Sequence, residues 1–323
     1  MDEGVPPVPG PKLYPFKDCD GPLDIKFLKF LGNGVHALVW SVLINGKPYV
    51  LKVFNQFRSD YLESNWEVKL SKDEEYAYFD AFSCECRAYG RIREAGLEQY
   101  VARCYGYIKL ARSDFIPLLQ HTELLERRLG YKQRHQGRPF RAIVKEYVKT
   151  DPNIHPPLPN LGTYNVRWTN RVFRDANDAK HLIRGVKRLQ KSGILVRDIN
   201  SGNVMNGRLV DFSRAWTVPH PVLVKEKIGN TVDFMDGGYS DASEVDELID
   251  IWNGQHLPNL RIWDRCMQNG NYCDKIRNHR ERRKGEFGPK WKWGTNNPGW
   301  YIRPELYKWQ ADNGPATKSR HWV

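Results

Sequence analysis

Apolar residues in the first half of the chain follow the spacing of β-strands. IKFLKFLGNG, from Ile25, precedes HALVWSVLINGKPYVLKVF, where apolar and β-branched residues lie on both sides of Asn45-Gly46. An Asn-Gly pair supplies the positive φ angles of a two-residue hairpin turn. These stretches predict three antiparallel strands, and YVARCYGYIKL and FRAIVKEYV predict two more.

Two stretches have helical spacing instead. KDEEYAYFDAFSCECRAYGRIREAG ends at Gly96, a residue typical of a helix C-terminus, and RDANDAKHLIRGVKRLQKSG is amphipathic. The first helix falls between the third and fourth strands. A second Asn-Gly pair, Asn206-Gly207, predicts another tight hairpin.

This order divides the chain into three parts. We expect an irregular arm at 1–23, a strand-rich unit at 24–150 with a basic insertion at 111–138, and a mainly helical unit at 151–323 that ends in a basic and aromatic segment at 275–323. The predicted class is α+β, with a five-stranded antiparallel sheet and one helix in the first unit and a short, helical second unit.

Composition indicates a globular protein with a basic surface. The chain has 323 residues, 40% of them hydrophobic, and a net charge of +12, which attracts polyanions. No run of about 18 apolar residues is present, so no membrane partner is expected. The N-terminus does not have the pattern of a signal peptide, and the six cysteines lack zinc-ligand spacing, which indicates free thiols in a reducing compartment, the cytoplasm.

Lys52 is the first candidate for chemistry. It stands in the apolar run YVLKVF, where an unpaired ammonium group is costly. Glu85, in the middle of the first predicted helix, is the preferred partner, and Glu74 or Glu75 are alternatives. Upstream, LGNGVHALVW places Gly32 and Gly34 between two strands, where their backbone N–H groups could close over a phosphate.

The stretch VRDINSGNVMNGRLVDFSRAW carries the second set of polar residues. Asp198 could accept a proton, while Asn203 and Asp211 offer the oxygen ligands that magnesium prefers. In this order, the residues resemble the glycine-rich loop, strand lysine, catalytic loop and metal-binding triplet of protein kinases. The resemblance implies a two-lobe kinase-like fold.

Three departures from the kinase pattern argue against phosphorylation of peptides. Asn200 stands where kinases carry a Lys, Ser213 replaces a Gly, and no APE-like end to an activation segment follows. The remaining chain is also short for a peptide-docking lobe. If a nucleotide bound, the resemblance would place Gly32, Gly34 and Glu146 around ATP and Mg²⁺ at Asn203 and Asp211.

Two cationic patches suggest RNA as a partner, because Arg and Lys neutralise phosphates and exposed aromatic rings can stack on bases. Four tryptophans accompany the patch near the C-terminus. A solvated helix followed by packed aromatic residues is the alternative interpretation. The candidate RNA-binding residues are Arg277, Arg280, Arg282, Arg283, Lys284, Lys290 and Lys292 near the C-terminus, and Arg127 and Arg128 in the insertion.

The whole chain resembles fungal proteins grouped by sequence with an inner-kinetochore subunit, and within that grouping the arginine-containing cyclodipeptide synthases. The resemblance implies an aminoacyltransferase of natural-product biosynthesis that joins arginyl-tRNA and a second aminoacyl-tRNA into a cyclo(Arg-Xaa) diketopiperazine. No cofactor and no stable protein partner would be needed. Asp198 would be the base and Lys52 would stabilise an oxyanion. The acidic stretch SDASEVDELID, from Ser240, could hold the arginine side chain or be a solvated helix face.

Two other functions remain open. An ATP- and Mg²⁺-dependent small-molecule or RNA kinase accounts directly for Lys52, Asp198, Asn203 and Asp211. A non-catalytic kinase-like kinetochore or scaffold protein accounts for the family grouping but gives the polar set no evident purpose. Of the three, the synthase is the favoured interpretation of the sequence.

Overall fold

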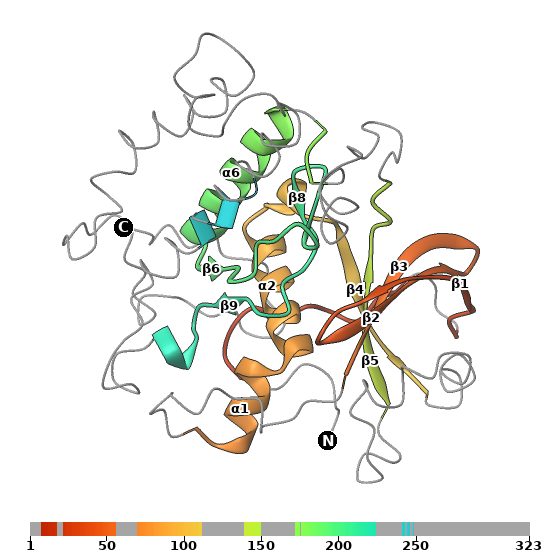
Figure 1. The fold of residues 1–323 in the computed structure, drawn as a ribbon. Coiled ribbons are helices and arrows are strands. Elements are labelled where there is room, and N and C mark those ends of the chain that lie inside the picture. Colours follow the sequence, from red (N-terminus) through yellow and green to blue (C-terminus); the bar gives the residue numbers. More distant parts are fainter. Residues whose placement is uncertain are drawn as a thin grey trace, which may run out of the picture.

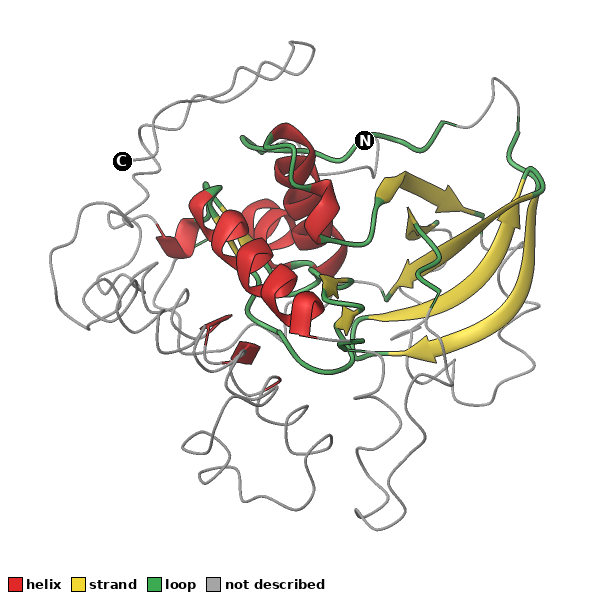
Figure 2. Cartoon of the chain, turned by 90° about the horizontal axis from the view of Figure 1, so that it is seen from above, coloured by secondary structure: helices red, strands yellow, loops and turns green. Residues whose placement is uncertain are grey.

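The computed structural model describes residues 8–17, 22–55, 70–111, 139–149, 172–174 and 176–223, and then 241, 242, 244, 245 and 248. It is a mixed α+β structure with one five-stranded antiparallel sheet, so the predicted class is confirmed at this level. The helices lie to one side of the sheet, and α2 lies between the sheet and α6 (Figure 1, Figure 2).

The sheet has the strand order β1-β2-β3-β5-β4, with β1 and β4 at its edges. Asn45 and Gly46 both have positive φ angles, 50° and 77°, and form the tight turn between β2 and β3 that the sequence predicted. The strand bounds are β1 Ile25–Asn33, β2 Ala37–Ile44, β3 Lys47–Phe54, β4 Cys104–Leu110 and β5 Phe140–Lys145.

The first predicted helix is in fact two helices, α1 (Lys72–Phe79) and α2 (Ala81–Glu94). Asp80 separates them with an extended backbone, and its carboxylate caps α2 by accepting from Ser83 N at 3.0 Å. The same carboxylate forms a buried, bidentate pair with Arg141 of β5 at 2.8 and 3.0 Å. The hydrophobic spacing runs through Asp80 without a break, so only the capping ability of Asp could have indicated the interruption.

The second predicted helix is α6 (Ala176–Lys191), and short strands follow it. The Asn206-Gly207 turn joins β7 to β8, with φ angles of 50° and 71°. A 3-10 turn at Glu98–Tyr100 precedes β4, and another lies at Pro221–Leu223. The short strands form two antiparallel pairs, β6 (Ile194–Leu195) with β9 (Trp216–Thr217), and β7 (Val204–Met205) with β8 (Arg208–Leu209).

Two hydrophobic clusters form the core. One joins α2 to α6 and the short strands, and it includes Phe82, Leu189 and Phe212. The other is formed mainly by sheet residues such as Trp40 and Leu51. Cys84, Cys86 and Cys104 are free and buried, and burial raises the pKa of Cys84 and Cys104 to about 12, so these thiols stay protonated.

The described part of the N-terminal arm packs on this core. Phe16 N donates to Tyr107 O at 2.8 Å, and Tyr107 N donates to Tyr14 O at 3.1 Å, so the arm pairs with β4. A side chain at either of two glycines would collide with the arm. A Cβ on Gly90 would lie 2.6 Å from Lys12 N, and a Cβ on Gly106 would lie 2.6 Å from Phe16 Cα.

The predicted insertion at 111–138 lies outside the described residues apart from Ala111, as does the basic and aromatic segment at 275–323. No helix in the described part of the chain is long and apolar enough to span a membrane.

Gly90 allows a test of the arm. Helix propensity alone favours Gly90→Ala by about 1 kcal/mol. Because the added methyl group meets the backbone of Lys12, we expect the opposite sign, a loss of about 1 to 3 kcal/mol in the free energy of unfolding. Denaturant unfolding measures it. The control is Gly34→Ala, where no atom lies within 4 Å, and a stabilising Gly90→Ala would contradict the packing of the arm.

Candidate functional site

Lys52 joins three elements at the centre of the site. Its Nζ lies 2.7 Å from Glu85 Oε2 on α2 and 2.7 Å from Asp211 Oδ2, which follows β8. The side chains of Lys52 and Glu85 are 6% and 0% exposed, so this is a buried ion pair. Glu85 is therefore the partner of Lys52 rather than Glu74, whose carboxylate instead forms a capping box with Ser71 at the start of α1.

Lys145 is a member of the site that sequence reasoning missed. It is the last residue of β5, and its Nζ lies 2.6 Å from Glu85 Oε1 and also donates to the carbonyl of Val210. Each oxygen of Glu85 thus has its own lysine. The signal was available, because Lys145 stands in the apolar run AIVKEYV, the same context that made Lys52 a candidate. We call Lys52, Lys145, Glu85 and Asp211 the buried charge cluster.

The lysines determine the charge state of Asp211. Burial would raise the pKa of this carboxyl group, but the ammonium groups of Lys52 and Lys145 and the N–H of Ser213 outweigh burial and hold the pKa well below its ordinary value. Asp211 is therefore ionised at neutral pH. With two cations and two carboxylates, the buried charge cluster has no net charge.

Asp198 lies in the loop before β7, and both of its carboxylate oxygens accept hydrogen bonds. Asn200 Nδ2 donates to Oδ1 at 2.7 Å, and Asn203 Nδ2 donates to Oδ2 at 3.0 Å. Asn203 Nδ2 also lies 3.0 Å from the Asp198 carbonyl oxygen. The structure thus brings Asp198 and Asn203 together, and the side-chain amides of Asn200 and Asn203 hydrogen-bond Asp198 within the loop.

Two acidic residues from the stretch after Ser240 support this loop. Asp241 accepts from Val196 N at 2.9 Å and from Arg197 N at 2.7 Å, and Glu244 accepts from Ile199 N at 2.7 Å. Asp241 is fully buried. The sequence interpretation offered these carboxylates as a pocket for an arginine side chain. For Asp241 and Glu244 that interpretation is wrong, because they bind backbone N–H groups of the chain itself.

The loop also carries a strained residue. Arg197 has a φ of 64°, which non-glycine residues rarely adopt. The two N–H bonds to Asp241 hold the backbone there, and the Arg197 guanidinium lies 3.5 Å from the centre of the Trp216 ring. Trp216 in turn stacks on His220.

The glycine-rich loop forms the turn between β1 and β2. Gly34 N donates to Ala37 O at 2.9 Å, and Asn55, just after β3, binds the carbonyl groups of Val35 and His36. A Cβ on Gly32 or Gly34 would meet no atom within 4 Å, so packing does not explain either glycine. Burial lowers the pKa of His36, which keeps the imidazole neutral at pH 7. The nearby charges of Asp211, Lys52 and Asp198 also act on this pKa.

Glu146, one of the residues that the kinase resemblance places around ATP, uses its side chain for contacts within the protein. Its carboxylate forms a bidentate pair with Arg208 of β8 at 2.9 and 3.0 Å and accepts from Arg103 N at 3.1 Å. The hydrogen bonds from Arg208 and Arg103 outweigh burial and lower the pKa of Glu146. This pair links the end of the sheet to the short strands.

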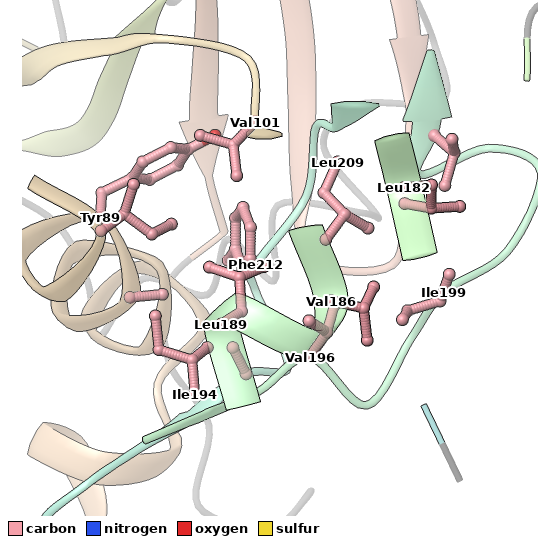
Figure 3. Packing of buried hydrophobic residues seen from close by; sticks show 14 of the residues in the cluster. Tyr89, Val101, Leu182, Val186, Leu189, Ile194, Val196, Ile199, Leu209 and Phe212 are labelled. Atoms are coloured by element: carbon pink, nitrogen blue, oxygen red, sulfur yellow. The ribbon is translucent and has the colours of Figure 1, made fainter. Parts of the chain in front are cut away.

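Hydrophobic packing connects the buried charge cluster to the core. Tyr89 lies one helical turn after Glu85 and packs edge-on against Phe212, the neighbour of Asp211, with ring centres 5.2 Å apart. Figure 3 shows Phe212 in the middle of the hydrophobic cluster that joins α2 to α6, with Tyr89, Val101, Val196 and Leu209 around it. The position of Asp211 is therefore fixed by its neighbour as well as by its own contacts.

Asp211 and Asn203, the candidate magnesium ligands, both make contacts within the protein. One oxygen of Asp211 lies against Lys52 and the other accepts from Ser213 N, while Asn203 turns its amide nitrogen toward Asp198. A magnesium ion at Asp211 Oδ2 would compete with the Lys52 ammonium group, which lies 2.7 Å from that oxygen. In the described part of the chain, no group of three His, Cys, Asp or Glu residues is arranged to hold a metal ion.

The candidate RNA-binding residues, including Arg127, Arg128 and the cationic residues from Arg277 to Lys292, all lie outside the described residues. The structure therefore does not place them relative to the buried charge cluster.

A comparison with protein families now gives the class of the protein. The family model of the kinetochore Sim4 complex subunit FTA2 matches residues 2–216, about two thirds of the chain. The match includes the sheet, α2, α6 and all four members of the buried charge cluster. The chain belongs to the FTA2 family. No curated protein sequence matches it.

The family assignment confirms the predicted kinetochore-subunit grouping and corrects three other predictions. A tRNA-dependent cyclodipeptide synthase of natural-product biosynthesis is wrong, because the family is described as a subunit of a kinetochore complex. Aminoacyl-tRNA as the partner, with no stable protein partner, is wrong, because a subunit of a complex has protein partners. A cytoplasmic location is wrong, because kinetochores are associated with chromosomes.

Asp241 generates a prediction about pH. Burial raises the pKa of Asp241 to about 7, although its two N–H donors favour the ionised form. A carboxyl group with a raised pKa in the folded state stabilises the fold fully below its unfolded pKa, and this contribution is lost as pH rises to about 7. Asn cannot titrate, so wild type should lose stability relative to Asp241→Asn from about pH 4 to 7.

Urea unfolding of both proteins at pH 5, 6, 7 and 8 measures this difference. The matched control is Asp73→Asn, which changes an exposed carboxylate in the first turn of α1. Its difference from wild type should stay nearly constant over the same range. A constant difference for Asp241→Asn as well would show that Asp241 is ionised throughout.

The buried charge cluster predicts a non-additive pair of substitutions. Glu85→Gln leaves two buried ammonium groups with one carboxylate and should cost about 3 to 5 kcal/mol in the free energy of unfolding. Lys145→Met alone leaves an excess carboxylate. The double variant restores charge balance, so its loss should be smaller than the sum of the single losses by at least about 1 kcal/mol.

Denaturant unfolding of the four proteins gives this coupling. The control combines Glu85→Gln with Arg184→Met, which removes a cation on the exposed face of α6 and should be additive. If the losses in the free energy of unfolding for Glu85→Gln and Lys145→Met are additive, the two side chains do not compensate each other's charge.

Proposed function

We propose that this chain is a non-catalytic, protein-kinase-like subunit of a kinetochore complex, located in the nucleus on chromosomes. In this proposal, the kinase-like polar residues hold the sheet and the helical part in a fixed relation. The surface of the resulting rigid core then binds other subunits. Family membership supports the kinetochore role, and the geometry of the site supports the structural use of the polar residues.

The two-lobe, kinase-like fold is part of the proposal. It is supported by the helical insertion after the third strand, by the Lys52–Glu85 pair between β3 and α2, and by the Asp198 loop followed by Asp211. Phe212 follows Asp211 and packs on α2, as the middle residue of the corresponding kinase triplet does. Fold alone does not imply phosphotransfer.

The main support for the non-catalytic role is that the charged side chains of the site form ion pairs with one another. Lys52 is bound between Glu85 and Asp211, and Lys145 supplies a second cation to Glu85. A kinase also pairs its strand lysine with a helix glutamate, so the Lys52–Glu85 pair fits both roles, but it leaves that lysine to contact phosphates and its aspartate to hold magnesium. Here a phosphate or a magnesium ion would have to compete with ion pairs that are already formed at 2.6 to 2.7 Å.

Phosphotransfer is the second candidate, and one observation favours it. The Asp211 side chain is 25% exposed, so a ligand could reach the group that would hold magnesium. Gly32, near the end of β1, and Gly34, in the turn to β2, also lack a packing reason, which is typical of chain that approaches a phosphate. ATP and Mg²⁺ would then be the required cofactors, and none is expected for the structural role.

Asp198→Asn, combined with a measurement of nucleotide binding, distinguishes the two candidates. This variant keeps the size of the side chain and removes the group that would accept a proton from a nucleophile. For a structural subunit, we expect it to assemble with the other subunits as wild type does, with a change of less than twofold in the recovered complex. Co-purification from cells that express either form measures this.

Nucleotide binding provides the opposing measurement. We expect 5 mM ATP with 10 mM MgCl₂ to leave the melting temperature of the wild-type protein unchanged, because a ligand stabilises only the state that binds it. A rise in melting temperature, together with phosphate transfer that falls at least about 100-fold in Asp198→Asn, would overturn the structural role in favour of a kinase.

A further inference from the structure

One face of α6 carries a row of cations. Lys180, Arg184 and Arg188 recur at every fourth position, so their side chains lie on one face of the helix, about 6 Å apart along its axis. We call these three residues the cationic row. Arg184 and Arg188 are exposed, and Lys180 is partly exposed. Lys187 and Lys191 belong to the same helix but make other contacts, and they are not part of the row.

The cationic row is not used for ion pairs within the described part of the chain. Arg184 Nε donates to Lys180 O at 3.3 Å, which is a contact inside the helix, and no described carboxylate pairs with any of the three cations. Asp178, the acidic residue of α6, is bound by Arg174. Attraction to the negative end of the helix explains a cation in the last turn, such as Arg188, but not Lys180 or Arg184 further in.

The apolar residues of α6 lie on its other face. Leu182, Ile183, Val186 and Leu189 are buried in the core that joins α6 to α2 (Figure 1). The exposed face therefore offers charge without an apolar centre. Interfaces between proteins have a core that is poor in charged residues and rich in aromatic ones. Interfaces with DNA are polar and strongly positive, so this face fits a phosphate backbone better than another protein.

The spacing and the surroundings agree with DNA as the partner. Duplex DNA carries one negative charge about every 1.7 Å along its axis, so each cation of a row with a spacing of about 6 Å has a phosphate within reach. The net charge of +12 attracts polyanions to the chain. The family is described as a subunit of a kinetochore complex, and kinetochores are associated with chromosomes.

We propose that the cationic row of α6 binds the phosphate backbone of duplex DNA. The contact has no sequence preference, because contacts to phosphates position a protein on DNA but do not read its bases. This inference rests on the proposed function in one respect, since a subunit located on chromosomes lies next to DNA. It adds a direct contact with the chromosome to the contacts with other subunits.

Fluorescence anisotropy of the purified full chain, with a labelled duplex of about 30 random base pairs, tests the cationic row. The variant combines Lys180→Gln, Arg184→Gln and Arg188→Gln, because Gln keeps a high helix propensity. We expect the affinity to fall at least tenfold at about 100 mM NaCl. The slope of log K against log salt concentration should also fall by about 2 to 3, because each phosphate contact contributes about 0.9.

Two matched controls accompany this variant. Lys26→Gln, Lys29→Gln and Lys72→Gln together remove the same charge from exposed positions on β1 and α1, and they should change the affinity less than about threefold. Arg184→Lys with Arg188→Lys keeps the charge of the row and should bind within about threefold of wild type. Melting temperatures check the fold. If the triple variant of the row does not fold, Arg184→Gln alone replaces it and should lower the slope by about 1.

Several results would overturn the proposal. These are an unchanged affinity in the variant of the row, equal losses in the variant and its control of equal charge, or no binding by the wild-type chain. Tighter binding to duplex RNA, or equal competition by poly-glutamate and unlabelled DNA, would overturn DNA as the partner.

Co-purification with a complex tests the proposed function separately. If the chain co-purifies with other subunits but the cationic row does not bind DNA, the structural role stands and this inference fails. If the row binds DNA but the chain joins no complex, the proposed function fails and the DNA contact stands.

Discussion

Glu85 is the residue on which the arrangement of this protein depends. It is fully buried on α2 and binds one lysine from β3 and another from β5. Lys52 also forms an ion pair with Asp211, and Lys145 also donates a hydrogen bond to the carbonyl of Val210. A single carboxylate thus connects the sheet to the segment after β8. An ionised group in this position is tolerated only because every charge has an opposite charge beside it.

The same principle operates at the other contacts between the sheet and the helical part. Asp80 ends α1, caps α2 and binds Arg141 of β5, and Glu146 binds Arg208 of β8. Each carboxylate lies where two segments far apart in the sequence meet. Apolar packing around Phe212 supplies the bulk of the burial, and the carboxylates fix which segments face each other, since a shift in register would leave a buried charge unpaired.

Local patterns were sufficient to predict the strands, α6 and both Asn-Gly turns, because their signals lie within a few neighbouring residues. The partner of Lys52 was also within reach, since a lysine in an apolar strand requires a carboxylate nearby. Asp241 could not be assigned in the same way. Its backbone partners are the N–H groups of Val196 and Arg197, 45 and 44 positions away in the sequence, and backbone groups have no sequence signature. The side chain of Gln190 adds a further hydrogen bond. The break at Asp80 was missed because apolar spacing continues across it.

The function was mispredicted for a related physical reason. Side chains that a kinase uses for chemistry are also well suited to joining two parts of a fold, because they are charged, buried and complementary. Sequence alone does not distinguish a lysine that contacts phosphate from one that contacts only carboxylates. Lys145 supports the proposed structural role, since a second cation beside Glu85 balances the charges of Asp211 and Glu85 without any ligand. In the proposed structural subunit, the residues of the buried charge cluster would be kept because they stabilise the fold, and no catalytic reaction is needed to explain them.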